Sequence, residues 1–79
     1  MQLEIKKFKN DDLYTVFTKN NKTYVAICYK DYITDIPTVD IFPSDSEGNI
    51  LVYYSELQIK YDNVNEENLI KTVELFKKS

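Results

Sequence analysis

The chain has 79 residues, 43% of them apolar and 29% charged, and a net charge of −3. It has no histidine and no arginine, which excludes Ser-His-Asp and Cys-His catalysis, zinc sites that use histidine, and bidentate arginine clamps on phosphate. The single cysteine, Cys28, excludes an internal disulfide. We therefore expect one domain over residues 1–79, with no catalytic activity and no cofactor-binding or metal-binding residues.

The amino-terminal region shows no sign of export. Residues 1–9 include three lysines and lack the apolar segment of a signal peptide. Nowhere does the sequence approach the roughly 18 consecutive apolar residues that a membrane-spanning helix needs. We expect a cytoplasmic protein.

The first element is predicted to be a strand over residues 2–9. Leu3 and Ile5 alternate with polar neighbours, which is typical of a strand with one buried face. The alternation breaks where Lys7 is followed by Phe8, which indicates a bulge or an early strand end. The Asn-Asp-Asp sequence that follows has the chemistry of a turn.

The next two elements are predicted to form a hairpin. Residues 13–18 and 23–30 are rich in β-branched and aromatic side chains, and Asn20-Asn21 suits a two-residue type I′ turn between them. Both faces of this hairpin are apolar, so we expect a helix on one face and contact with a partner on the other, although packing against a longer strand or closure into a barrel would give the same pattern. The turn sets the register, in which Phe17 faces Tyr24, Val16 faces Val25 and Tyr14 faces Ile27.

The middle of the chain is predicted to be less regular. Residues 31–38 read as a connection, and residues 39–42 as a short strand whose flanking prolines suit an edge or a strand end. Residues 44–49 read as a polar loop that contains the only glycine, Gly48, the best candidate for a positive φ.

Residues 50–61 are the longest strand-like segment. Alternate positions are apolar over most of it, which predicts either one long bent strand or two strands hinged near Ser55. The apolar residues of that shared parity are Leu51, Tyr53, Leu57, Ile59 and Tyr61.

The final element is predicted to be a helix. Asn65 can cap its start, acidic residues fill the first turn and lysines the last, as the helix dipole favours. One apolar stripe at helical spacing should pack on the sheet; it consists of Leu69, Ile70, Val73 and Phe76. The element order predicts an α+β fold, a single antiparallel sheet of about five strands with one C-terminal helix on a face.

Charge is unevenly distributed along the chain. No lysine occurs between Asp31 and Ile59, a segment with six carboxylates. An acidic surface with tyrosines would bind a basic site on another protein and compete there with nucleic acid. We therefore predict a protein-binding module, an inhibitor of a nucleic-acid-handling enzyme, of the kind that phages and mobile elements use against bacterial defences. The predicted partner-binding residues are Asp31, Tyr32, Asp35, Asp40, Phe42, Asp45, Glu47, Tyr53, Tyr54 and Glu56.

Three alternatives remain open at the sequence level. The acidic segment also fits a solvated loop that keeps a small protein in solution, and acidic loops of this kind are common. Six amino-terminal lysines among aromatic residues would suit a weak binder of single-stranded nucleic acid or nucleotides, although direct nucleic-acid binding is the less favoured reading. Exposed strand edges offer a route to a homodimer or a larger scaffold. The aromatic residues of the second alternative are Tyr14, Phe17, Tyr24 and Tyr29.

Overall fold

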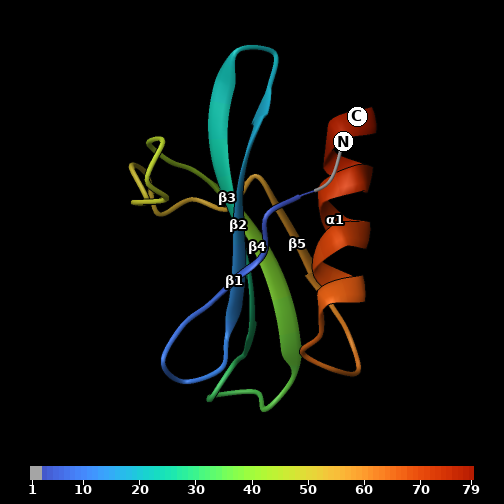
Figure 1. Cartoon of the computed structure of the whole chain (residues 1–79). Coiled ribbons are helices and arrows are strands. Elements are labelled where there is room, and N and C mark those ends of the chain that lie inside the picture. The colour runs from blue at the N-terminus through green and yellow to red at the C-terminus, as the bar shows by residue number, and fades with distance from the viewer. Residues whose placement is uncertain (1–2) are drawn as a thin grey trace.

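The computed structural model describes residues 3–79. Over that range the chain forms five strands and one helix: β1 (Lys6–Lys7), β2 (Leu13–Lys19), β3 (Lys22–Lys30), β4 (Pro37–Pro43), β5 (Leu57–Lys60) and α1 (Glu66–Lys78). The strands lie side by side in chain order, each antiparallel to its neighbours, and α1 packs across one face (Figure 1). The predicted α+β fold is confirmed. Within the described range, α1 is neither long nor apolar enough to cross a membrane.

The β2–β3 hairpin forms as predicted. Phe17 pairs with Tyr24 and Val16 with Val25, so the register is the one that the turn implies. Asn20 and Asn21 have φ values of 54° and 66°, which is the left-handed backbone of a type I′ turn. Asparagine tolerates this conformation because its short polar side chain bonds locally.

The amino-terminal strand is shorter than predicted, and the fourth is longer. Only Lys6–Lys7 of residues 2–9 is a strand, and residue 2 lies outside the described range. Leu3 and Ile5 nevertheless pack against the core. β4 lies inside the sheet between β3 and β5, and its prolines stand at its two ends, where a missing N–H donor costs least.

The largest error in the sequence analysis concerns residues 50–61. Only Leu57–Lys60 forms a strand there, and it pairs with residues 38–41 in the middle of β4. Residues 44–56 form a long loop, which we call the β4–β5 loop. Alternating apolar residues alone do not make a strand, because β4 offers backbone partners only to the part of the segment that reaches it.

The core lies between α1 and the sheet. From the helix, Leu69, Val73 and Phe76 are buried, whereas Ile70 of the predicted stripe is half-buried. Asn65 caps α1 as predicted, since its side chain accepts a hydrogen bond from the Asn68 amide at 2.8 Å. Facing the helix, the sheet buries Leu13, Phe17, Ala26, Cys28, Val39 and Ile41.

Part of the opposite face of the sheet is covered by the β4–β5 loop, seen in yellow at the left of Figure 1. Gly48 has the predicted positive φ, 89°, and a Cβ atom there would lie 3.1 Å from Val16 and 3.9 Å from Val25. Val25 is only 1% exposed. The chain itself therefore occupies part of the face on which we expected a partner.

Candidate functional site

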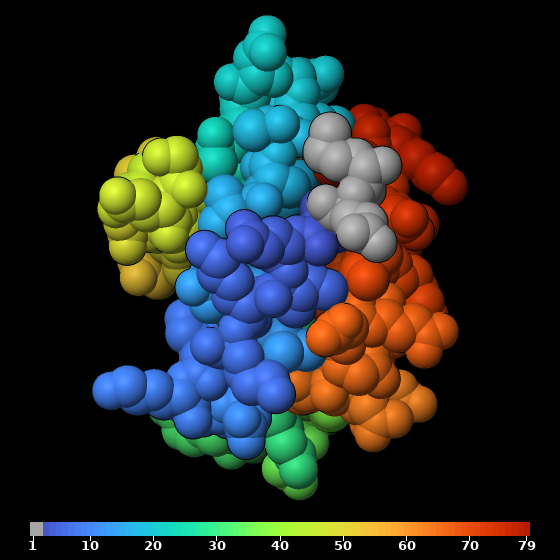
Figure 2. All heavy atoms as spheres, viewed as in Figure 1, coloured from blue at the N-terminus to red at the C-terminus, as the bar shows by residue number. Residues whose placement is uncertain are grey.

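The most unusual surface feature is a run of four consecutive exposed apolar residues in the β4–β5 loop. Leu51, Val52, Tyr53 and Tyr54 are 65%, 54%, 82% and 74% exposed, respectively. Figure 2 shows the β4–β5 loop, in yellow and gold, standing out from the body of the molecule. Single exposed apolar residues are ordinary, but contiguous ones on a small protein mark interaction sites. We call these four residues the apolar run.

The loop is held in place before the run. Asp45 accepts hydrogen bonds from the backbone amides of Glu47 and Asn49, each at 2.9 Å, and from the Asn49 side chain. The Asn49 bonds, with further backbone bonds, lower the pKa of the Asp45 carboxyl. Ser44 pairs with Ile50 as an isolated bridge. These contacts confirm the predicted loop and close it into a tight turn over the sheet.

The loop is also held immediately after the run. The Ser55 hydroxyl lies 2.8 Å from a carboxylate oxygen of Asp40 and from the Leu57 carbonyl oxygen. The Glu56 amide donates a hydrogen bond to the Ile41 carbonyl at 2.7 Å. At the start of the run, the Leu51 amide donates to the Pro43 carbonyl at 2.9 Å. The run therefore projects from a segment that is anchored at both ends.

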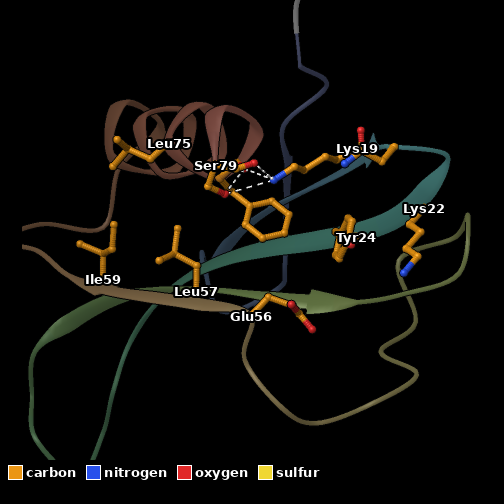
Figure 3. A pocket seen from close by; sticks show the side chains of 10 residues that line it. Lys19, Lys22, Tyr24, Glu56, Leu57, Ile59, Leu75 and Ser79 are labelled. Atoms are coloured by element: carbon orange, nitrogen blue, oxygen red, sulfur yellow. Dashed lines mark hydrogen bonds between the residues drawn. The ribbon is translucent and has the colours of Figure 1, made fainter.

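Two hollows lie next to the β4–β5 loop, and Glu56 of the loop lines both. The smaller, about 320 Å³, is lined by Leu51 and Glu56 together with Lys22 and Tyr24 of β3. The larger, about 710 Å³, lies between β5 and the end of α1, where Leu57, Ile59 and Leu75 meet (Figure 3). The two hollows share three lining residues, which are Lys22, Tyr24 and Glu56.

A lysine closes one end of the larger hollow. Lys19 Nζ donates to the carbonyl oxygens of Phe76 and Ser79 at 2.6 and 2.7 Å, the bonds drawn in Figure 3. These carbonyls end α1, where the helix dipole favours a cation. The Lys19 ammonium group therefore stabilises the end of α1.

The ten residues predicted to bind a partner do not form one surface. Asp40 is only 3% exposed and lies under the loop, so it cannot belong to a docking surface, and this prediction was wrong. The sequence analysis placed it on the surface because acids are rarely buried, but here hydrogen-bond donors within the fold compensate for its burial. Asp31, Tyr32 and Asp35 lie in the turn before β4, and the loop follows β4, so the two groups are about 20 Å apart.

The two carboxylates in the turn before β4 each have a partner close by. Asp31 accepts hydrogen bonds from the amides of Ile33 and Thr34. Asp35 lies 3.3 Å from Lys30 as an exposed ion pair. These carboxylates therefore organise or neutralise their own turn.

The other predicted residues do gather at the β4–β5 loop. Asp45, Glu47, Tyr53, Tyr54 and Glu56 belong to it, and the half-buried ring of Phe42 lies 6.1 Å from that of Tyr53. Sequence reasoning missed Leu51 and Val52, because their alternation was read as part of a strand. The unbroken apolar sequence from residue 50 to residue 54, directly after a Gly-Asn turn, was the signal that could have revealed them.

The aromatic residues near the amino-terminal lysines make contacts inside the fold. Phe17 is buried beneath α1, and Tyr24 contacts Phe76 edge to face at 4.9 Å. Tyr14 stacks on Phe8, and Tyr29 bonds to Asp40. This arrangement disfavours a base-stacking platform on that sheet.

The acidic side chains and the single thiol are the remaining groups to consider. Over residues 3–79 no three acidic or cysteine side chains converge into a metal-binding group. Cys28 is fully buried, and burial raises the pKa of its thiol, which keeps it protonated and unreactive. No family model, curated protein or solved structure matches this chain.

Proposed function

We propose that this protein is a non-catalytic protein-binding module that inserts its apolar run into an apolar cleft of a partner. The observation that carries the proposal is the run itself: four adjacent apolar side chains, each more than half exposed, on a loop anchored at both ends. A loop that is already ordered loses little conformational entropy when it binds, so more of its contact energy appears as affinity.

Apolar contact outweighs charge in this proposal. Burying one side chain of this size is worth about 1.5–3 kcal/mol, whereas an exposed ion pair contributes about 0–1 kcal/mol. Asp45, Glu47 and Glu56 flank the run, and the loop has no lysine, so basic side chains at the rim of the cleft would suit it. Such charges steer association and select partners more than they add affinity.

The most specific form of the proposal is inhibition of a nucleic-acid-handling enzyme at its basic groove. The lysine-free loop supports it. Mimicry of a phosphate track has less support, since Asp40 is buried and the two acids of the preceding turn lie at the far end of β4. A bound inhibitor of this kind should be displaced by excess nucleic acid, whereas a partner with an unrelated site should be insensitive to it.

The test compares two tyrosine-bearing surfaces of the same protein. Extract from the cells that naturally make the protein is passed over the wild-type chain and two variants, and retained proteins are identified by mass spectrometry. The loop variant carries Leu51→Ser, Val52→Ser, Tyr53→Ser and Tyr54→Ser. The control carries Tyr32→Ser and Ile33→Ser in the turn before β4, where these residues are 91% and 79% exposed.

We expect a partner that wild type and control retain and the loop variant loses, with all three melting at closely similar temperatures because none of the changed side chains is buried. If the loop variant retains the partner and the control loses it, the binding site lies at the other end of β4 and the proposal is overturned. A benzophenone amino acid at position 53 or 32 then reports direct contact by cross-linking. The alternative of a homodimer is a separate question, which sedimentation of the purified chain would answer.

A further inference from the structure

Asp40 is the most unusual buried group in the described part of the chain. It lies in the middle of β4 on the face opposite the helix, between Ile27 of β3 and Gln58 of β5, and it is 3% exposed. Its neighbours Val39 and Ile41 point to the apolar core. An apolar residue at position 40 would suit the centre of a sheet better, because burial of a carboxylate carries a large desolvation cost.

The carboxylate is satisfied by neutral donors alone. It accepts hydrogen bonds from the Tyr29 hydroxyl and from Gln58 Nε2 at 2.8 Å, and the Ser55 hydroxyl lies 2.8 Å from it and shares its one proton between Asp40 and the Leu57 carbonyl oxygen. Burial, and then the bond to Asp40, raise the pKa of the Tyr29 hydroxyl, so Tyr29 stays a donor at neutral pH. In residues 3–79 the one ion pair joins Lys30 to Asp35, so Asp40 has no cation of its own.

The three donors belong to two different parts of the molecule. Tyr29 and Gln58 are on the strands that flank β4, and those strands are held by their own ladders. Ser55 is in the β4–β5 loop and follows Tyr54 directly. Its Cα is about 3.8 Å from that of Tyr54, so a bond that fixes Ser55 restricts where the apolar run can lie.

We propose that Asp40 is a positioning residue for the apolar run. Through Ser55 it fixes the outgoing end of the loop, so that Tyr53 and Tyr54 are held out from the sheet in one arrangement. The charged acceptor makes this a stronger tether than a neutral one would be. The importance of the tether for binding rests on the proposed function, but its effect on the loop does not.

Two single hydroxyl deletions separate this role from a general contribution to stability. Ser55→Ala and Tyr29→Phe each remove one donor to the same carboxylate, one in the loop and one in the sheet. Two readouts apply to the purified protein: {¹H}-¹⁵N heteronuclear NOEs of residues 52–54, and the rate of chymotryptic cleavage after Tyr53 and Tyr54. Urea unfolding confirms that each variant is folded under the assay conditions. Ser55→Thr, which keeps a hydroxyl, is the rescue variant.

We expect Ser55→Ala to lower the NOEs of the run and to raise its cleavage rate by about tenfold, as local opening becomes easier. Tyr29→Phe should leave both at wild-type values, and Ser55→Thr should restore them. Asp40→Leu should loosen the run as Ser55→Ala does, even if its unfolding free energy is unchanged or raised.

Equal loosening by Tyr29→Phe and Ser55→Ala would overturn the proposal, because Asp40 would then act only on the sheet. An unchanged run in Ser55→Ala would overturn it as well. Neither readout needs the partner, so loss of the proposed function in the capture experiment leaves this inference intact. Conversely, a run that stays rigid without the tether leaves the binding proposal intact.

Discussion

The two faces of this sheet are covered in different ways. On one face α1 presses Leu69 and Val73 into a contiguous apolar core. On the other, the β4–β5 loop is fixed by hydrogen bonds, and the buried groups include Asp40 and Thr38. Apolar contact is strong but non-directional, whereas hydrogen bonds define position. The helix face therefore supplies most of the stability, and the loop face supplies a defined place from which the apolar run projects.

The largest effect should come from placing a charge in the helix face. Val73→Asp puts a carboxylate without partners at a site that is 1% exposed, and we expect it to cost more than about 4 kcal/mol, much of the total stability of a small domain. Circular dichroism during urea unfolding measures it. Leu75→Asp, on the same helix but 50% exposed, should change stability by less than about 1 kcal/mol. Similar losses in both would mean that burial of the helix against the sheet is not the cause of the effect.

A smaller effect is expected from the tight contact under the loop. Gly48→Ala forces a Cβ atom into a left-handed backbone position 3.1 Å from Val16. We expect a loss of about 1–2 kcal/mol, measured by thermal unfolding. Ser46→Ala, an exposed change in the same turn, is the control and should be neutral. A neutral Gly48→Ala would mean that the loop does not press on this face.

The end of the helix offers a third comparison, between two lysines on either side of the hairpin turn. Lys19→Met removes the donor to the last carbonyls of α1, and we expect a loss of about 1 kcal/mol in unfolding free energy. Lys22→Met should be neutral, because Lys22 is exposed and makes no such bond in the described structure. If both variants are equally stable, Lys19 does not cap the helix.

The smallest effect concerns pH and the turn at Asp45. Hydrogen bonds from Asn49 and from backbone amides favour the ionised carboxyl, so its pKa is lower in the folded state than in the unfolded chain. The stabilisation is therefore present above the ordinary aspartate pKa of about 3.9 and is lost as pH falls through the lower folded-state value. Carboxyl ¹³C NMR should show a titration midpoint below about 3.9. A midpoint at or above it would contradict the geometry of the turn, and Asp45→Asn should remove this pH dependence.

Much of the fold could be predicted because its signals are local. Asn20-Asn21 specifies the hairpin turn, and with it the register of β2 and β3. Asn65 and the charges at the two ends of the helix specify where α1 begins and ends. Each of these features depends on residues close together in the chain, which is why sequence reasoning found them.

The candidate site was only partly predictable because it depends on contacts between distant residues. Tyr53 and Tyr54 were found as surface aromatics, but Leu51 and Val52 were assigned to a strand, whereas the β4–β5 ladder includes only Leu57–Lys60 of that segment. Asp40 was assigned to the surface, since acids are rarely buried.

The sequence by itself determined an antiparallel sheet with a capped amphipathic helix, a chain without histidine or arginine chemistry, and a lysine-free middle segment. Only the tertiary structure decided which acids are exposed and which residues form the apolar run. The physical reason is that Tyr29, Ser55 and Gln58, up to 29 residues apart, must meet around Asp40 before its charge can be buried and the loop held in place.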